Sequence, residues 1–218
     1  MKYLAPFLCI TLLLSKGCQK VNLNEDVPSY IKIESIDVIV EENQGSNSHN
    51  IIDAWIYFDN NLQGVYPLPT IFPVLAEGKQ NISIKAGIKS NGIAATRVNY
   101  PFYDYYKEEV SLTKDRTTII NPEVNYFNNT EFHIIDFESG SKTFTITSNS
   151  DTNLLVNNDT VFEGNSGGVH LAEPHLTFEM ATEAIQLPKV GTPVYAELNY
   201  KCNTPFQVGV FANFTQTV

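Results

Sequence analysis

The segment Tyr30–Val40, with the sequence YIKIESIDVIV, decides the fold class of this chain. Apolar and polar residues alternate along it, and a period of two is typical of a β-strand that buries one face. The alternation slips by one position near Ser35, which predicts a β-bulge. No segment outside the N-terminus keeps a helical period, so we expect an all-β protein. The apolar positions are Ile31, Ile33, Ile36, Val38 and Val40.

The following residues repeat the strand pattern between turn residues. Asp59-Asn60-Asn61 and Glu77-Gly78-Lys79 are residue types that tolerate turn backbones. Prolines at 67, 69 and 73 indicate strand ends or edges, because proline cannot donate a hydrogen bond to a neighbouring strand. The predicted strands are Ile51–Phe58, Leu62–Tyr66, Leu68–Leu75, Asn81–Ala86 and Thr117–Asn121.

This order of strands and turns resembles the PEGA and carboxypeptidase-regulatory-like β-sandwiches of cell-envelope proteins. The segments Asp53–Tyr57, Gly64–Leu75 and Gly87–Arg97, followed by Tyr100–Tyr103, are similar to blocks in uncharacterised Bacteroidota lipoproteins. The resemblance implies an immunoglobulin-like or PEGA-like sandwich over residues 30–128, followed by a jelly roll, and it brings no activity with it. Asn128-Asn129-Thr130 is the expected boundary.

The region 129–218 resembles the jelly roll of carbohydrate-binding modules in the segments Phe132–Gly140 and Pro193–Phe211. That resemblance implies a structural calcium ion near Asp136 or Glu138, since calcium prefers hard oxygen ligands. The alternative is that both carboxylates face solvent on one side of a strand. The candidate strands are Phe132–Phe137, Thr143–Thr147, Gly168–Ala172, Leu176–Met180, Val194–Tyr200 and Phe206–Phe214.

A jelly roll needs eight strands, and several of these candidates are weak. We therefore expect a shortened jelly roll that is incomplete or completed by a partner. Its apolar segment Pro205–Phe214 would then be an unpaired edge.

An aromatic run between residues 100 and 106 has two interpretations. In the first interpretation, the rings form a stacking platform for sugars, with Tyr103, Tyr105 and Tyr106 as the candidate residues. Alternatively, the run is a strand whose alternate rings fill a core or a domain junction.

The N-terminal residues 1–18, MKYLAPFLCITLLLSKGC, have the order of an export signal: a lysine, a short apolar run and small residues before a cysteine. The apolar run is too short to span a bilayer. Its Gly17-Cys18 end resembles a bacterial lipoprotein signal, which implies cleavage after residue 17 and acylation of Cys18. Residues 18–29 then form a flexible tether. Ordinary secretion, with no role for Cys18, is the alternative.

The net charge and the cysteine content limit the binding partners and the disulfide bonds that this chain can have. The 218-residue chain has a net charge of −10 and no basic cluster, which argues against nucleic-acid binding and leaves lipid as the membrane tether. Loss of Cys9 with the signal and acylation of Cys18 leave Cys202 as a free thiol without a disulfide partner. Strand alternation places Cys202 on the same face as Tyr200, and we expect it to be buried.

No catalytic constellation stands out, and we expect no enzyme and no cofactor beyond the calcium ion above. Gly164–Gly168, with the sequence GNSGG, matches the G-x-S-x-G motif of a nucleophile elbow, but no strand-to-helix unit surrounds it. The four histidines lack zinc-site spacing. Asp159-Thr160-Val161 resembles the acceptor of Bacteroidota O-glycosylation at Thr160.

Two functional hypotheses remain open. In the first, the protein is a lipoprotein of the outer membrane, facing either the periplasm or the exterior, that binds polysaccharide or assists its uptake. In the second, it is an adhesion or assembly component that contacts another envelope protein.

Overall fold

The computed structural model describes residues 26–138, 144–159 and 161–211. These residues form strands and one 3₁₀ turn, η2 (Ser90–Gly92), and contain no α-helix, so the all-β prediction is confirmed. Two compact units arise. Of the described residues, the first unit comprises 26–36, 52–87 and 105–122, and the second comprises 37–51, 88–104 and those from 123 to 211. This division differs from the sequence boundary at residue 128, which stays a prediction.

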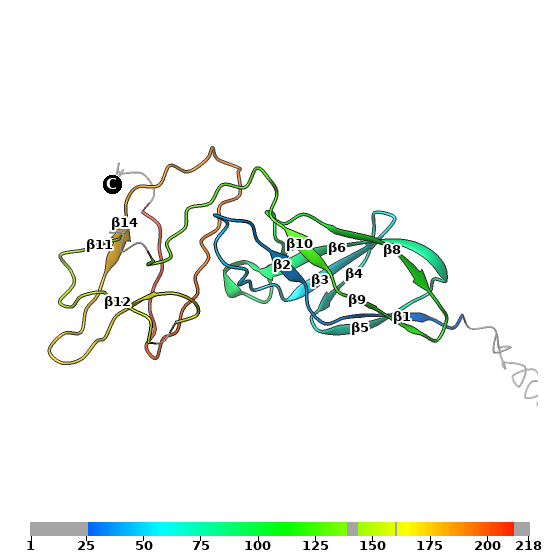
Figure 1. Cartoon of the computed structure of the whole chain (residues 1–218), viewed down its shortest axis with the longest axis horizontal. Coiled ribbons are helices and arrows are strands. Elements are labelled where there is room, and N and C mark those ends of the chain that lie inside the picture. The colour runs from blue at the N-terminus through cyan, green and yellow to red at the C-terminus, as the bar shows by residue number, and fades with distance from the viewer. Residues whose placement is uncertain (1–25, 139–143, 160, 212–218) are drawn as a thin grey trace, which may run out of the picture. The chain divides into compact units, whose positions relative to one another are not determined.

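The first unit is a β-sandwich of two sheets (Figure 1). One sheet has the order β5-β1-β9, in which β1 pairs antiparallel with β5 and parallel with β9. In the other sheet β4, β3 and β6 follow one another, and β8 also pairs with β6. The strands of this unit are β1 (Ser29–Ile33), β3 (Asp53–Phe58), β4 (Asn61–Pro67), β5 (Thr70–Val74), β6 (Gly78–Lys89), β8 (Tyr106–Leu112) and β9 (Thr117–Ile120). The short strand β7 (Arg97–Asn99) belongs to the second unit.

Alternation along these strands builds the core between the two sheets. Tyr66 of β4 stacks on Phe72 of β5 with ring centroids 4.1 Å apart, which joins the sheets face to face. Removal of these side chains from water is the main stabilising contribution to the unit. The buried apolar side chains are Ile31, Ile33, Ala54, Ile56, Phe58, Phe72, Val74, Ile82, Ile84, Ala86, Val110, Leu112 and Ile120.

The break in alternation predicted near Ser35 is present. β1 ends at Ile33 and β2 (Asp37–Ile39) begins four residues later, where β2 pairs parallel with β10 (Glu123–Asn125). Ile33 and Ile36 are both fully buried although they lie three residues apart. The irregular backbone between them therefore shifts the buried face by one position.

Turn residues have the conformations that their types predict. Asp59 and Asn60, between β3 and β4, have φ values of 45° and 66°, and Gly78, at the start of β6, has a φ of 78°. Gly87 is needed for a different reason. A Cβ atom there would lie 2.7 Å from Trp55 Nε1, so the indole can lie against β6 only because residue 87 has no side chain.

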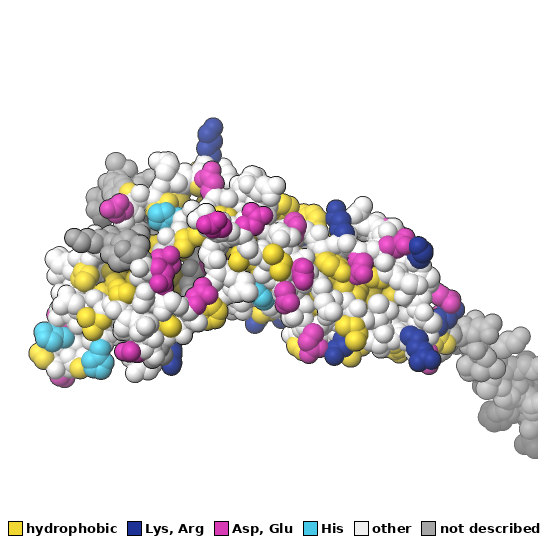
Figure 2. All heavy atoms as spheres, in the orientation of Figure 1, with side chains coloured by type: hydrophobic (Ala, Val, Ile, Leu, Met, Phe, Trp, Pro, Cys, Tyr) yellow, Lys and Arg dark blue, Asp and Glu magenta, His cyan; other side chains and the backbone are white. Residues whose placement is uncertain are grey.

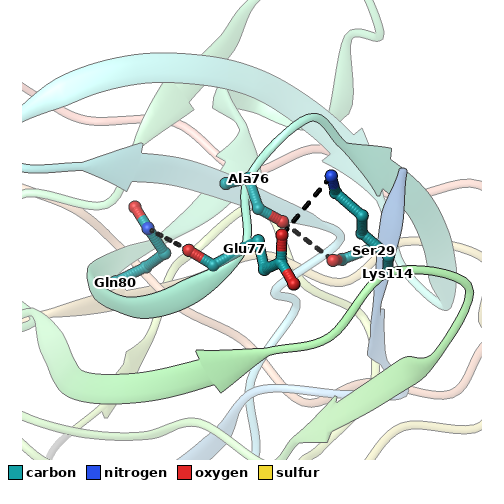
Figure 3. A network of polar contacts seen from close by, with 5 residues as sticks. All are labelled: Ser29, Ala76, Glu77, Gln80 and Lys114. Atoms are coloured by element: carbon teal, nitrogen blue, oxygen red, sulfur yellow. Dashed lines mark hydrogen bonds and ion pairs between the residues drawn. The ribbon is translucent and has the colours of Figure 1, made fainter. Parts of the chain in front are cut away.

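A polar network holds one end of the sandwich together (Figure 3). The fully buried Ser29 donates its hydroxyl hydrogen to the Ala76 carbonyl at 2.8 Å. The Lys114 ammonium lies 3.4 Å from a Glu77 carboxylate oxygen, and Gln80 donates to the Glu77 carbonyl. These contacts tie the start of β1 to the β5–β6 and β8–β9 connections.

The region from residue 129 onward is less regular. Its strands pair as two ladders, β11 (Phe144–Ile146) with β14 (Met180–Thr182) and β12 (Leu155–Asn157) with β13 (Ser166–Gly168). No residue that the structure describes between 129 and 211 is buried. Figure 2 shows hydrophobic side chains at the surface of the region that carries β11 and β12.

Most strands predicted for this region are wrong. Of the six candidates, only Thr143–Thr147 matches a strand, β11, while Gly168–Ala172 and Leu176–Met180 each overlap a strand by one residue. Phe132–Phe137 cannot be a continuous strand, because Phe137 has a φ of 63°. Val194–Tyr200 and the described part of Phe206–Phe214 have no paired neighbour strand, and alternation alone does not satisfy backbone hydrogen bonds. The eight strands of a jelly roll are not present in the described part of this region.

Candidate functional site

The outer face of the sheet β3-β6-β8 gathers aromatic and basic side chains. Because side chains alternate along a strand, burial of Ile56 and Ile84 turns Tyr57 and Lys85 outward. The strand register sets Trp55 opposite Lys85, Tyr57 opposite Ser83, and Ser83 opposite Lys107. The face thus combines residues from three strands that are far apart in the sequence.

Two lysines lie against the tyrosine rings of this face. The Lys85 ammonium is 4.4 Å from the centroid of the Tyr105 ring and 4.9 Å from that of Tyr57. The Lys107 ammonium is 5.9 Å from the Tyr105 centroid. Both distances for Lys85 fall within the range of cation–π attraction. We call Tyr57, Lys85, Tyr105 and Lys107 the tyrosine–lysine face.

The tyrosine–lysine face is accessible and carries positive charge. Tyr105 is 43% exposed, Lys107 is exposed, and Tyr57 and Lys85 are half-buried. Within the described residues, neither ammonium of the face has a carboxylate within 4.0 Å. Three other lysines of the first unit do form ion pairs: Lys32 with Glu34, Lys79 with Glu109, and Lys114 with Glu77.

Tyr103, a predicted sugar-stacking residue, is inside a tyrosine cluster of the second unit. It is 3% exposed, and its ring lies 4.5 Å from Tyr100 and 4.8 Å from Tyr126. Burial raises the pKa of all three tyrosines, and the Tyr100 hydroxyl donates to the Glu197 carboxylate. No face of the Tyr103 ring is open to a sugar, so the stacking hypothesis is wrong for this residue. The alternative interpretation, a core aromatic, is correct here.

Of the other two candidates, Tyr105 directly precedes β8 and lies against Lys85 of the outer face, whereas Tyr106 is the first residue of β8 and belongs to its other face. Tyr106 is paired with Ile84, is half-buried, and donates its hydroxyl hydrogen to Glu108. Successive side chains of a strand alternate, so Tyr106 cannot share a sugar ring with Tyr105. Of the three candidates, Tyr105 is the one whose side chain is exposed, and the Lys85 ammonium lies over its ring.

Asp136 and Glu138, the calcium candidates, lie in an irregular segment. Asp136 accepts a hydrogen bond from the Glu138 backbone at 3.0 Å, and Glu138 accepts from the backbone and side-chain amides of Asn165. Among the described residues no group of three or more His, Cys, Asp or Glu side chains is arranged to hold a metal ion. The predicted strand on which the two carboxylates shared a face is absent.

Cys202 is exposed and lies outside any strand, so its predicted burial is wrong. The prediction depended on a strand through Val194–Tyr200, which does not form. Cys18, predicted to be acylated, and Thr160, the O-glycosylation candidate, lie outside the described residues. In the described part of the chain no helix has the length and apolar character needed to cross a bilayer.

A polar depression in the second unit is a weaker candidate site. It is lined by acidic and amide side chains, among them Glu41, Asp104 and Asn125. Asp104 accepts a hydrogen bond from the Asn125 backbone at 2.8 Å, and Asn125 accepts one from the Asp104 backbone. These groups satisfy one another and leave Asp104 engaged within the fold.

Comparison of the chain with protein-family models, with curated proteins and with solved structures finds no match in any of the three. The assignment of the candidate site therefore depends on the geometry of its residues alone.

Proposed function

We propose that this protein is a non-catalytic, glycan-binding protein of the bacterial cell envelope. The observation that supports this function is the tyrosine–lysine face, in which the 43% exposed Tyr105 lies with the Lys85 ammonium over its ring and the Lys107 ammonium nearby. A flat aromatic surface with polar groups at its edge suits a sugar ring, which has apolar C–H faces and a rim of hydroxyls. Glycosidases instead place two carboxylates across a cleft, whereas this face offers lysines and tyrosines.

A glycan array with the purified protein tests the proposal. Tyr105→Ala should weaken binding of any captured glycan about threefold to tenfold, because an aromatic contact contributes roughly 0.5–1.5 kcal/mol. Tyr200→Ala is the matched control, since Tyr200 is also an exposed tyrosine but lies outside the face. Equal losses for both variants, or no captured glycan, would contradict the proposal.

Lipid anchoring at Cys18 is the second part of the proposal. It is supported by the short apolar segment before Gly17-Cys18 and by the polar tether after it. Cys18→Ala should move the protein from the membrane fraction to the soluble fraction. A variant that stays with membranes after a high-salt wash would exclude the lipid anchor.

An adhesion or assembly role is the second candidate function. It is favoured by the absence of buried residues in the described part of 129–211, where Val210 is 75% exposed and Phe211 is 87% exposed. Apolar surface of this kind often marks a protein interface. Hydrogen exchange of residues 161–211 should then be slower in intact envelopes than in the purified protein, and equal rates would reject this role.

A further inference from the structure

We infer that the tyrosine–lysine face binds an anionic glycan, whose sugars carry carboxylate or sulfate groups. The inference rests on the proposed function and names the class of ligand. It depends on three properties of the face: the positions of its lysines, the state of the nearby carboxylates, and the charge of the rest of the chain.

In the part of the chain that the structure describes, no carboxylate lies within 4.0 Å of either ammonium of the face. Lys85 and Lys107 contact the Tyr105 ring, whereas Lys32, Lys79 and Lys114 are held in ion pairs elsewhere in the same unit. A cation–π contact leaves the ammonium its full charge and holds it over the ring. An anionic group on a sugar that approaches Tyr105 would therefore meet positive charge.

The carboxylates on the same strands do not oppose such a ligand directly. Glu109, two residues from Lys107 and on the same side of β8, lies 2.6 Å from the Lys79 ammonium. Glu108 points to the other side and accepts the hydrogen bond from Tyr106. Lys85 and Lys107 are the charged groups that lie over the Tyr105 ring, and the neighbouring Asp104 carboxylate accepts hydrogen bonds from Asn125.

The overall charge makes the face selective. A chain with a net charge of −10 repels polyanions in general, so a polyanion gains attraction only where positive groups are concentrated. A single exposed ion pair contributes little in water, but a repeating polymer offers many equivalent groups, which raises the effective concentration at the site.

The experiment compares three polymers by affinity electrophoresis of the full-length protein. Dextran is the neutral reference, dextran sulfate carries sulfates on the same backbone, and polygalacturonate carries carboxylates. We expect retardation by at least one of the anionic polymers and much less by dextran. The retardation should decrease with added salt, because salt screens exposed charges.

Variants localise the effect to the face. Lys85→Gln and Lys107→Gln should each weaken retardation about threefold to fivefold, and Lys85→Arg should retain most of it. Lys107 is exposed, so its replacement leaves the core intact. Lys114→Gln removes the same charge from the connection between β8 and β9, where the lysine is paired with Glu77, and should have little effect.

Each outcome separates the two proposals. Equal binding of dextran and the anionic polymers, with Tyr105→Ala weakening both, would overturn the anionic class and leave glycan binding standing. Equal losses for Lys114→Gln and Lys85→Gln would show non-specific attraction and overturn the inference. Absence of retardation by all three polymers would overturn the inference, and the glycan array then decides the proposed function.

Discussion

Ile119 and Ile120 are adjacent residues of β9 that test the sandwich directly. Ile120 is 2% exposed and pairs with Ile33 of β1 in the parallel ladder, whereas Ile119 is 63% exposed and pairs with Lys32. Replacing each by alanine removes the same atoms from the same strand. The two variants therefore differ in burial and share the change in strand propensity.

Ile120→Ala should reduce the free energy of unfolding by about 2–5 kcal/mol, the usual cost of truncating a buried isoleucine. Ile119→Ala should cost less than about 1 kcal/mol, because it changes strand propensity alone. With a urea m-value of about 2 kcal/mol/M, the Ile120 midpoint falls by about 1–2.5 M and that of Ile119 by less than about 0.5 M.

Urea unfolding of the purified protein, followed by the fluorescence of Trp55, measures both midpoints. Trp55 belongs to the same unit and is the one tryptophan in the chain. Similar midpoint shifts for the two variants would refute the assignment of β9 as a strand with one buried face.

Two further predictions follow from the second unit. Cys202 is exposed, so it should react with a thiol reagent in the native protein nearly as fast as in urea; slow native labelling would contradict this placement. Backbone N–H groups of Thr177 and Leu176 donate to the Asp151 carboxylate and lower its pKa. The ionised carboxylate therefore stabilises the fold at pH values above its ordinary pKa of 3.8, and this stabilisation is lost as the pH falls through the lowered pKa of the folded protein. The Leu176 and Thr177 amide resonances should shift in that acidic range by NMR, and Asp151→Asn should remove the shift; an inflection above 3.8 would refute the lowered pKa.

In the aromatic run between residues 100 and 106, the sequence predicted part of the structure of the site. Strand alternation correctly allowed some rings to fill a core, and Tyr103 does so. Alternation could not show that Tyr105 lies beside Lys85, because that contact depends on the pairing of β6 with β8. Lys85, Lys107 and Tyr57 were not predicted as site residues. The outward positions of Tyr57 and Lys85 in their alternating strands were the available signal.

The strands predicted after residue 129 were mostly wrong for a related reason. Segments such as Val194–Tyr200 alternate as strands do, yet they form no ladder in the described structure. Alternation records which face a strand would bury, and a ladder also needs a neighbouring backbone to accept and donate hydrogen bonds. Cys202 was placed wrongly because its predicted burial depended on that strand.

The sequence by itself determined the all-β class, the slip near Ser35 and the turns at Asp59-Asn60 and Gly78. Each of these depends on side-chain alternation or on backbone preference, and both are local properties. The tertiary structure alone decided the parallel pairing of β1 with β9, the need for Gly87 beneath Trp55, and the meeting of Lys85 with Tyr105. Those features depend on strand register, and register is set by the packing of distant segments into one core.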